Sequence, residues 1–214
     1  MKYVVWDWNG TLLDDVLISI ECMNVLLRQY KLKELMNKEE YRNRFCFPVE
    51  QYYQNLGFYF SAIPFTVLAN EFMGLYRMKS KQCNLNNGVI EVIDIIRYNG
   101  LKQIVLSASN KNILAEQVAE SGISLYFDKI LGIEDNYAKT KIEVAKKWKN
   151  ENSILGTDIV MVGDTYHDYE VSETLGCSCI LYSSGHQRIN TDIYHGAKVA
   201  AKFENILDYI MDKD

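Results

Sequence analysis

Residues 3–14 have the sequence Tyr-Val-Val-Trp-Asp-Trp-Asn-Gly-Thr-Leu-Leu-Asp, and the fold can be inferred outward from them. A short apolar run leads to an acidic residue, Asp7, and a glycine-containing turn follows. Short apolar runs that end in turn residues are typical of strands buried in a parallel sheet. The pattern therefore predicts a strand over Tyr3–Trp8 that holds a carboxylate at its carboxyl end.

Further apolar runs alternate with amphipathic helical patterns through residues 88–211. Such alternation is typical of βαβ units, so we expect an α/β fold with a parallel sheet of five or six strands. The further strands are predicted at Gln103–Ser107, Lys129–Ile133, Asp158–Val162 and Cys179–Tyr182, with a weaker pattern at Val199–Phe203. The helices are predicted at Gly88–Tyr98, Asn112–Glu120, Lys141–Asn150, Asp168–Leu175 and Asn205–Met211. The glycines expected to cap four of the helical runs in the left-handed conformation are Gly100, Gly122, Gly156 and Gly176.

A block of helical patterns with no strand between them interrupts this alternation directly after the first strand. We interpret it as an inserted all-helical cap domain over residues 15–82, and the core as residues 1–14 plus 83–214. Eleven of the 26 aromatic residues lie between Tyr41 and Tyr76, and we expect most of them to form the core of the insertion. The helices of the insertion are predicted at Val16–Tyr30, Glu39–Phe47, Val49–Asn55 and Phe65–Lys81.

The composition excludes several classes of protein. With 214 residues, of which 48% are hydrophobic and 24% charged, the chain is expected to fold and to bury roughly 70% of its unfolded surface. The net charge of −5 and the lack of a long Lys/Arg run argue against nucleic acid binding. No apolar run approaches the ~18 residues that cross a bilayer, so no membrane partner is expected.

Five scattered cysteines, together with a first strand that leaves no room for a leader, predict reduced thiols and a cytoplasmic location. Cys177 and Cys179 alternate along one predicted strand, and we expect both to be buried structural cysteines.

Polar residues follow the predicted strands where each one ends. Asp7 follows the first strand, Ser107 ends the second, Lys141 begins a helix after the third, and Asp164 and Asp168 follow the fourth. Because the carboxyl ends of parallel strands meet at one edge of the sheet, these side chains should converge. Three carboxylates in one small cleft need a counter-ion, and hard oxygen ligands suit Mg²⁺.

The remaining groups at this edge suit a phosphoryl group. Lys141 supplies positive charge and Ser107 a hydroxyl, and the main-chain N–H groups of the turn at Gly10 and Thr11 are expected to bind phosphoryl oxygens. An aspartate beside Mg²⁺ and a lysine is a plausible nucleophile toward phosphorus, which makes Asp7 the candidate for an aspartyl-phosphate.

These residues resemble the motifs of the haloacid dehalogenase-like hydrolases, and in particular small phosphatases of the phosphoglycolate phosphatase type. The likeness extends over nearly the whole length and implies a Rossmann-like core with a helical cap. Residues 7–14 resemble the first motif of the family. Ser107 matches the second, Lys141 the third, with Lys139 as the less favoured candidate, and Gly163, Asp164 and Asp168 the fourth.

The resemblance implies a role for each matching residue. Asp7 would attack phosphorus, and Mg²⁺ would be held by Asp7, the main-chain carbonyl of Asn9 and Asp164, with support from Asp168. Ser107, the adjacent Ala108 and Lys141 would bind the phosphoryl oxygens, and Lys141 would also neutralise Asp7. The implied partner is a small phosphorylated metabolite, and a monomer and a homodimer are both compatible with the sequence.

One residue departs from the family pattern. The second aspartate of the first motif normally protonates the leaving group and activates water, and Asn9 occupies that position here. An amide cannot transfer a proton, and general acid–base catalysis is typically worth ~10²–10⁴-fold. We therefore expect a slow phosphatase that favours acyl or aryl phosphates and accumulates its phosphoenzyme. His167 and His186 are candidate substitutes to which we assign no catalytic role.

Other interpretations stay open at this point. A non-catalytic protein that binds a phosphometabolite or a protein partner would explain the loss of the acid/base residue. A receiver domain places its phosphorylated aspartate after the third strand, here near Glu134 and Asp135, and has no helical insertion. The apparent metal site argues against a metal-free dehalogenase. A phosphonate-cleaving enzyme would need a Schiff-base lysine from the cap, and the candidates are Lys31, Lys33, Lys38, Lys79 and Lys81.

Overall fold

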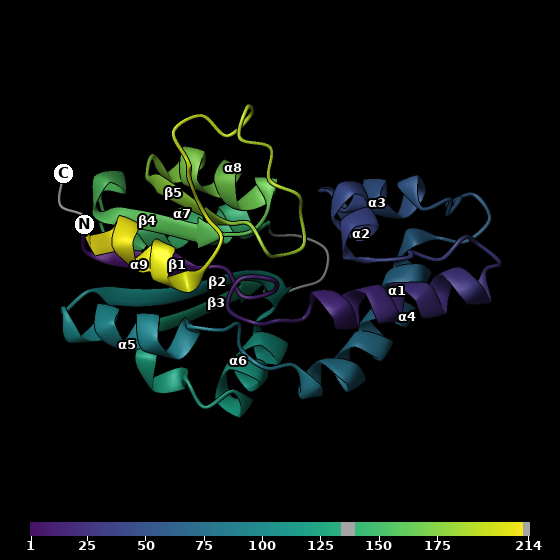
Figure 1. The fold of residues 1–214 in the computed structure, drawn as a ribbon, viewed down its shortest axis with the longest axis horizontal. Coiled ribbons are helices and arrows are strands. Elements are labelled where there is room, and N and C mark those ends of the chain that lie inside the picture. The colour runs from purple at the N-terminus through teal and green to yellow at the C-terminus, as the bar shows by residue number, and fades with distance from the viewer. Residues whose placement is uncertain (134–139, 212–214) are drawn as a thin grey trace.

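A six-stranded parallel sheet forms the centre of the molecule in the computed structural model, which describes residues 1–133 and 140–211 (Figure 1). The strand order is β3-β2-β1-β4-β5-β6, so β1 lies in the middle and both of its neighbours are parallel to it. This confirms the α/β fold class and the parallel sheet. The strands are β1 (Tyr3–Trp6), β2 (Lys102–Asn110), β3 (Lys129–Ile133), β4 (Ile159–Gly163), β5 (Ser178–Tyr182) and β6 (Lys198–Ala200).

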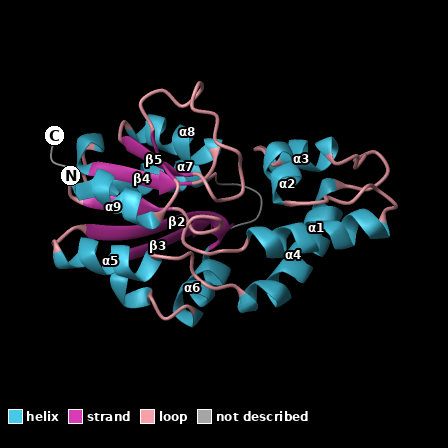
Figure 2. Cartoon of the chain, viewed as in Figure 1, coloured by secondary structure: helices cyan, strands magenta, loops and turns pink. Residues whose placement is uncertain are grey.

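Helices cover both faces of the sheet and bury its apolar side chains. One face packs against α5, α6 and α9 around Trp6 and Phe203, and the opposite face packs against α7 and α8 around Val5 and Trp148 (Figure 2). Both faces of the strands are therefore apolar, as expected for a buried parallel sheet. The helices are α5 (Val89–Tyr98), α6 (Lys111–Glu120), α7 (Lys141–Glu151), α8 (Tyr166–Leu175) and α9 (Phe203–Met211), with short 3₁₀ helices at Ser124–Tyr126 and Gly156–Asp158.

A second, all-helical unit lies at the carboxyl edge of the sheet (Figure 1). Its buried residues form a hydrophobic cluster of their own, in which Leu26, Leu27 and Leu68 are completely buried among the rings of Tyr41, Tyr52 and other aromatic residues. Most of the aromatic residues of the insertion belong to this cluster, as the sequence predicts. The helices of the unit are α1 (Val16–Gln29), α2 (Lys38–Arg44), α3 (Val49–Asn55) and α4 (Phe65–Lys79), followed by a 3₁₀ turn at Ser80–Gln82.

The two segments that join the helical unit to the sheet lie side by side. Asp14 N–H donates to the carbonyl of Asn84 at 2.9 Å, and Asn86 N–H donates to the carbonyl of Leu12 at 2.9 Å. Leu13 and Leu85 form an antiparallel bridge between these two bonds. The chain thus leaves and re-enters the sheet unit through one pair of hydrogen-bonded segments.

Several element boundaries differ from the sequence predictions. β2 continues to Asn110 instead of ending at Ser107, and α2 ends at Arg44 because Phe47 precedes a proline, which disfavours helical backbone there. Gly156 is not a left-handed cap, and Ser153 takes that conformation after α7 with a φ of 51°. A Cβ atom at Gly156 would lie 2.2 Å from the carbonyl oxygen of Gly176, so close backbone approach explains this glycine.

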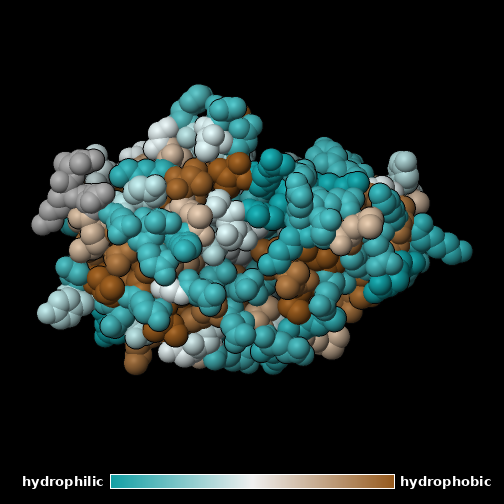
Figure 3. Space-filling model, viewed as in Figure 1, coloured by the Kyte–Doolittle hydropathy of each residue, from teal (hydrophilic) through white to brown (hydrophobic). Residues whose placement is uncertain are grey.

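The surface shows few extended apolar areas in the view of Figure 3, where hydrophilic residues prevail on both units. Within the described part of the chain, no helix combines the length and hydropathy needed to cross a membrane. Cys179 is buried and Cys177 partly so, and both thiols are free, as are those of the other three cysteines.

Candidate active site

The carboxyl edge of the sheet brings the predicted polar residues together. Asp7 directly follows β1, and its N–H donates to the carbonyl of Val162 at 2.8 Å, which fixes it beside the end of β4. Ser107 lies within β2 and Lys141 is the first residue of α7. All three residues are buried, and their side chains line one cavity.

Lys141 bridges two carboxylates, that of Asp7 after β1 and that of Asp168 in the first turn of α8. Its Nζ donates to Asp7 Oδ1 and, at 2.5 Å, to Asp168 Oδ1. The helix that carries it begins with a capping box in which Thr140 accepts from the N–H of Glu143. This cap fixes the first turn of α7, so the ammonium group is held between the two carboxylates.

Asp168 and Asp164 are held by main-chain and side-chain donors in equal number. Asp168 Oδ2 accepts from the N–H groups of Asp164 and Thr165 at 3.1 and 3.0 Å and from the Thr165 hydroxyl at 2.7 Å, which caps α8. Asp164 accepts from the Thr11 hydroxyl at 2.9 Å and from the N–H of His186 at 2.6 Å. The Asp168 carboxylate thus both caps the start of α8 and orients the ammonium group of Lys141.

The pKa values of these groups follow from their crowding. Burial and the nearby Asp168 and Asp164 carboxylates raise the pKa of Asp7 well above its ordinary value, although Lys141 opposes them. Burial and Asp168 likewise raise the pKa of Asp164 to about 6. For Lys141, burial acts to lower the pKa, but Asp168 and Asp7 outweigh it and keep the side chain an ammonium. One ammonium therefore does not fully compensate the three carboxylates.

A divalent cation fits this excess of negative charge. One carboxylate oxygen from each of Asp7, Asp164 and Asp168 lies within 4.8 Å of the other two, and all three residues are buried. Oxygen donors of this kind are the ligands that Mg²⁺ takes in proteins. Burial and crowding raise the pKa values of Asp7 and Asp164 even though Lys141 lies beside Asp7, and a divalent cation would supply the missing positive charge, so the residues present fit the ion.

A cavity of about 250 Å³ extends from these residues toward the helical unit. Asp7, Asn9, Ser107 and Lys141 line the end at the sheet, and aromatic side chains line the other end. Asp7 Oδ2 accepts no hydrogen bond from any residue in the described ranges, whereas Oδ1 is bound by Lys141. One oxygen of Asp7 is therefore available to a ligand.

The amide of Asn9 is fixed on both sides. Its Nδ2 donates to Asp15 Oδ2 at 2.9 Å and to the Tyr76 hydroxyl at 2.6 Å, while its Oδ1 accepts from the Ser109 hydroxyl at 2.9 Å. Asp15 and Tyr76 belong to the helical unit, and Ser109 belongs to β2. Asn9 thus bridges the two units beside the nucleophile candidate.

The sequence does not predict a buried cluster of polar side chains around Asp15. Besides Asn9 and Tyr76, the Asp15 carboxylate accepts from the N–H of Gly10 at 2.7 Å and lies 3.0 Å from His186 Nε2. Burial alone acts to raise the pKa of Asp15, but His186 and the other donors lower it below its ordinary value. The neighbouring Asp14 is exposed, so of the two adjacent acids only Asp15 faces inward.

His186 pairs with this carboxylate as an imidazolium. Burial acts to lower its pKa, but Asp15 outweighs burial and raises the pKa to about 9. In that form both nitrogens donate, Nε2 to Asp15 and Nδ1 to the Tyr41 hydroxyl at 2.7 Å. Because both nitrogens are engaged, His186 has no ring nitrogen left to face a substrate.

The other predicted site residues have mixed outcomes. Ala108 lines the cavity. The N–H of Gly10, however, already donates to the Asp15 carboxylate and to the carbonyl of Leu13. Thr11 is completely buried, and its hydroxyl donates to Asp164. The phosphate-binding role predicted for the Gly10 N–H therefore disagrees with the hydrogen bonds that it makes. His167 lines the cavity and contacts Glu170 at 3.1 Å. Lys139, Glu134 and Asp135 lie outside the described residues.

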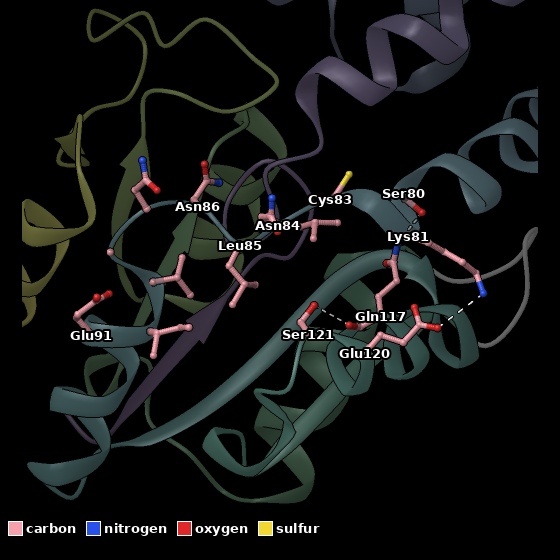
Figure 4. Close-up of a pocket in the computed structure, with 15 residues that line it drawn as sticks. Ser80, Lys81, Cys83, Asn84, Leu85, Asn86, Glu91, Gln117, Glu120 and Ser121 are labelled. Atoms are coloured by element: carbon pink, nitrogen blue, oxygen red, sulfur yellow. Dashed lines mark hydrogen bonds and ion pairs between the residues drawn. The ribbon is translucent and has the colours of Figure 1, made fainter.

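A larger cavity of about 560 Å³ lies elsewhere, between residues 83–91, the end of the helical unit and α6 (Figure 4). Asn84, Asn86 and Gln117 line it together with a contact between Lys81 and Glu120 at 3.7 Å. None of the predicted site residues lines this cavity, so we place the candidate active site in the smaller one.

Comparisons with known proteins agree with this geometry. A family model described as haloacid dehalogenase-like hydrolase matches residues 4–182. A search of curated proteins finds no match.

Among solved structures, the haloacid dehalogenase-like family protein SP0104 from Streptococcus pneumoniae is 16% identical with a TM-score of 0.85, and the match covers 99% of each chain. A predicted phosphoglycolate phosphatase from Haemophilus somnus is 16% identical with a TM-score of 0.78, covering 99% of this chain and 98% of that one. CbbY from Rhodobacter sphaeroides, as a variant in complex with xylulose-1,5-bisphosphate, is 15% identical with a TM-score of 0.73, covering 95% of each chain.

At these identities the solved structures establish a common fold. The family model goes further, because it spans the strands that carry Asp7, Ser107 and Asp164 and the helix that carries Lys141. The chain therefore belongs to the haloacid dehalogenase-like hydrolase family.

Proposed function

We propose that the protein is a Mg²⁺-dependent phosphatase that hydrolyses a small phosphorylated metabolite through an aspartyl-phosphate on Asp7. The observation that carries the proposal is the position of Asp7: one of its oxygens is bound by Lys141, and the other is unbound by the described residues at the end of a cavity. Family membership and the sugar bisphosphate in the CbbY structure support a phosphorylated substrate.

In the proposed reaction, Asp7 Oδ2 attacks phosphorus, the bond from phosphorus to the ester oxygen breaks, and water later hydrolyses the aspartyl-phosphate. Lys141 orients Asp7 and binds a phosphoryl oxygen, and the Ser107 hydroxyl binds another. Asp7, the main-chain carbonyl of Asn9 and Asp164 would hold the ion, with Asp168 in support. When bound, Mg²⁺ supplies the charge that keeps Asp7 ionised and offsets the charge on the phosphoryl oxygens.

Asn9 cannot protonate the leaving oxygen, so that oxygen must depart as an anion or take its proton from water. Leaving groups of low pKa, such as acyl and aryl oxygens, should therefore react faster than alkyl oxygens. Loss of general acid catalysis costs about 3–5 kcal/mol of barrier, which slows the reaction and leaves the nucleophile, the metal site and the phosphoryl-binding groups in place.

We further propose that residues 15–82 act as a cap over this site and that residues 1–14 and 83–214 form the catalytic core. The separate hydrophobic cluster of the helical unit and the paired connecting segments support this division. A phosphonate-cleaving activity has less support, because none of the five cap lysines lines the cavity, and Lys79 instead pairs with Glu21 at 3.0 Å.

The main rival is a protein that binds phosphorylated ligands without turning them over, which the loss of the acid at position 9 favours. A screen of phosphate esters with and without Mg²⁺ separates the two functions. A phosphatase should release phosphate from at least one ester only with Mg²⁺, and Asp7→Ala should abolish the release. Binding of the same esters without any release of phosphate would favour the rival.

A further inference from the structure

The cavity that holds Asp7 continues between two walls of apolar side chains. One wall comes from α4, through Ala69, Phe72 and Met73, and the other comes from the segment between α2 and α3, through Phe45 and Phe47. Ligand sites use such walls to bury the apolar part of a molecule and a few polar groups to orient it.

Both walls are anchored to residues beside the phosphoryl site. Phe72 stacks on Tyr76 with ring centroids 6.0 Å apart, and the Tyr76 hydroxyl contacts Asn9. On the other side, Phe45 lies 5.4 Å from the ring of His186, centroid to centroid. The rings are therefore held at a fixed position relative to Asp7, so they can select the group attached to the phosphate.

The cationic side chains among the described lining residues already have acidic partners. Lys141 binds Asp7 and Asp168, and His186 pairs with Asp15. The arginines of α2 do not line the cavity: Arg42 donates to the carbonyl of Ser183, and Arg44 pairs with Glu40 at 3.0 Å. Among the described lining residues, a second anionic group on the substrate would meet rings instead of an unpaired cation, which is unfavourable.

We infer that the group esterified to the phosphate is uncharged, apolar and about the size of one ring, so that the preferred substrates are aryl monophosphates. This inference rests on the proposed phosphatase function. The volume of about 250 Å³ is below the roughly 300–1,000 Å³ of sites for drug-sized ligands, which suits a phosphoryl group and one such ring. Asn9 favours the same class independently, because an aryl oxygen leaves without a proton donor.

Binding can be tested apart from turnover with two stable phosphonates. With Mg²⁺ present, phenylphosphonate should bind at least about tenfold more tightly than methylphosphonate, because even one methylene in an apolar pocket is worth about tenfold or more. Phe45→Ala and Phe72→Ala should each lower this ratio at least about threefold, because each removes part of one wall. The matched control is Phe60→Ala, which removes a ring of the same hydrophobic cluster that does not line the cavity and should leave the ratio unchanged.

Equal binding of the two phosphonates, or a ratio that Phe60→Ala lowers as much as Phe45→Ala does, would overturn the inference. Thermal unfolding of each variant separates loss of the wall from loss of the fold.

Turnover distinguishes the inference from the function on which it rests. Phenyl phosphate should exceed 2-phosphoglycolate and a sugar bisphosphate in kcat/KM by at least about tenfold. Benzyl phosphate, which has the same ring on an alkyl oxygen, should match phenyl phosphate in KM and fall below it in kcat. Preference for a substrate with two anionic groups would refute the inference and leave the phosphatase standing. Phosphate release from none of these esters, with phenylphosphonate still bound more tightly, would refute the phosphatase alone.

Discussion

Asn9 stands where the family has its proton donor, and its amide bridges the two units of the molecule. Its Nδ2 lies 2.9 Å from Asp15 Oδ2, so an aspartate at position 9 would place two carboxylates against each other in a buried site. Buried like charges that lack a partner are strongly unfavourable. The amide is therefore matched to Asp15 and is not a simple loss of the catalytic acid.

This arrangement predicts that Asn9→Asp alone gains little activity and destabilises the protein. The double variant with Asp15→Asn exchanges amide and carboxylate, and it should raise kcat for alkyl phosphates by about 10²-fold or more, which is the usual worth of a general acid. Steady-state kinetics and thermal unfolding at pH 7.5 measure both effects. The exposed neighbour Asp14 supplies the control, since Asp14→Asn should not change the effect of Asn9→Asp. Full activation by the single variant without loss of stability would contradict the account.

Asp164 gives a prediction for metal binding. Its pKa is raised to about 6, and Mg²⁺ binds the deprotonated carboxylate, so the proton and the metal compete. The fraction of deprotonated Asp164 is near nine-tenths at pH 7 and one-tenth at pH 5, so the apparent Kd for Mg²⁺ should rise at least about tenfold between these values, since the pKa of Asp7 is raised as well. Calorimetric titration of the substrate-free protein measures this change, and a constant Kd from pH 5 to 7 would argue against Asp164 as a ligand.

The loop after β5 connects the helical unit to the sheet through hydrogen bonds. It supplies the His186 ring to Asp15 and Tyr41 and the His186 N–H to Asp164. In the same loop, the N–H of Arg188 donates to the carbonyl of Arg42 at 3.1 Å. One short segment therefore contacts both the predicted metal site and helix α2.

The pH dependence of stability tests this contact. The pKa of His186 is raised from 6.5 to about 9 by Asp15, so the protonated form stabilises the folded state fully below about pH 6.5 and less as the pH rises toward 9. The difference corresponds to about 3 kcal/mol. The free energy of unfolding should fall by an amount of this order between pH 6.5 and 9. His186→Gln should be less stable at pH 6.5 and nearly constant over this range. A parallel decline in the variant would show that another group titrates.

The sheet supplies the groups for phosphoryl transfer, and the helical unit supplies most of the cavity wall. The sequence suffices to predict Asp7, Ser107, Lys141, Asp164 and Asp168 as neighbours, because the end of a parallel strand fixes where its next residue lies. It does not suffice for the contact between Asp15 and Tyr76 or for that between Asp15 and His186. Asp15 and Tyr76 lie on different elements of the helical unit, and His186 lies in the loop after β5, so these contacts depend on how the helices and the two units pack.

Local sequence patterns also fail to predict the backbone conformation and hydrogen bonds at positions where tertiary contacts determine them. Gly156 follows a helical run and has the sequence signature of a cap, but its position is set by the carbonyl groups of Leu175 and Gly176 against it. Likewise, nothing in the turn after Asp7 indicates that the N–H of Gly10 is engaged by a carboxylate five residues later.

The covalent intermediate on Asp7 is the most direct test of the account. The protein should be mixed with Mg²⁺ and phenyl phosphate, quenched in acid during turnover, and analysed by intact-mass and peptide mass spectrometry. Because Asn9 cannot activate water, we predict a phosphate adduct that accumulates during turnover, maps to Asp7 and is absent from Asp7→Asn. Steady release of phosphate with no adduct on Asp7, or an adduct that persists in Asp7→Asn, would contradict the central claim.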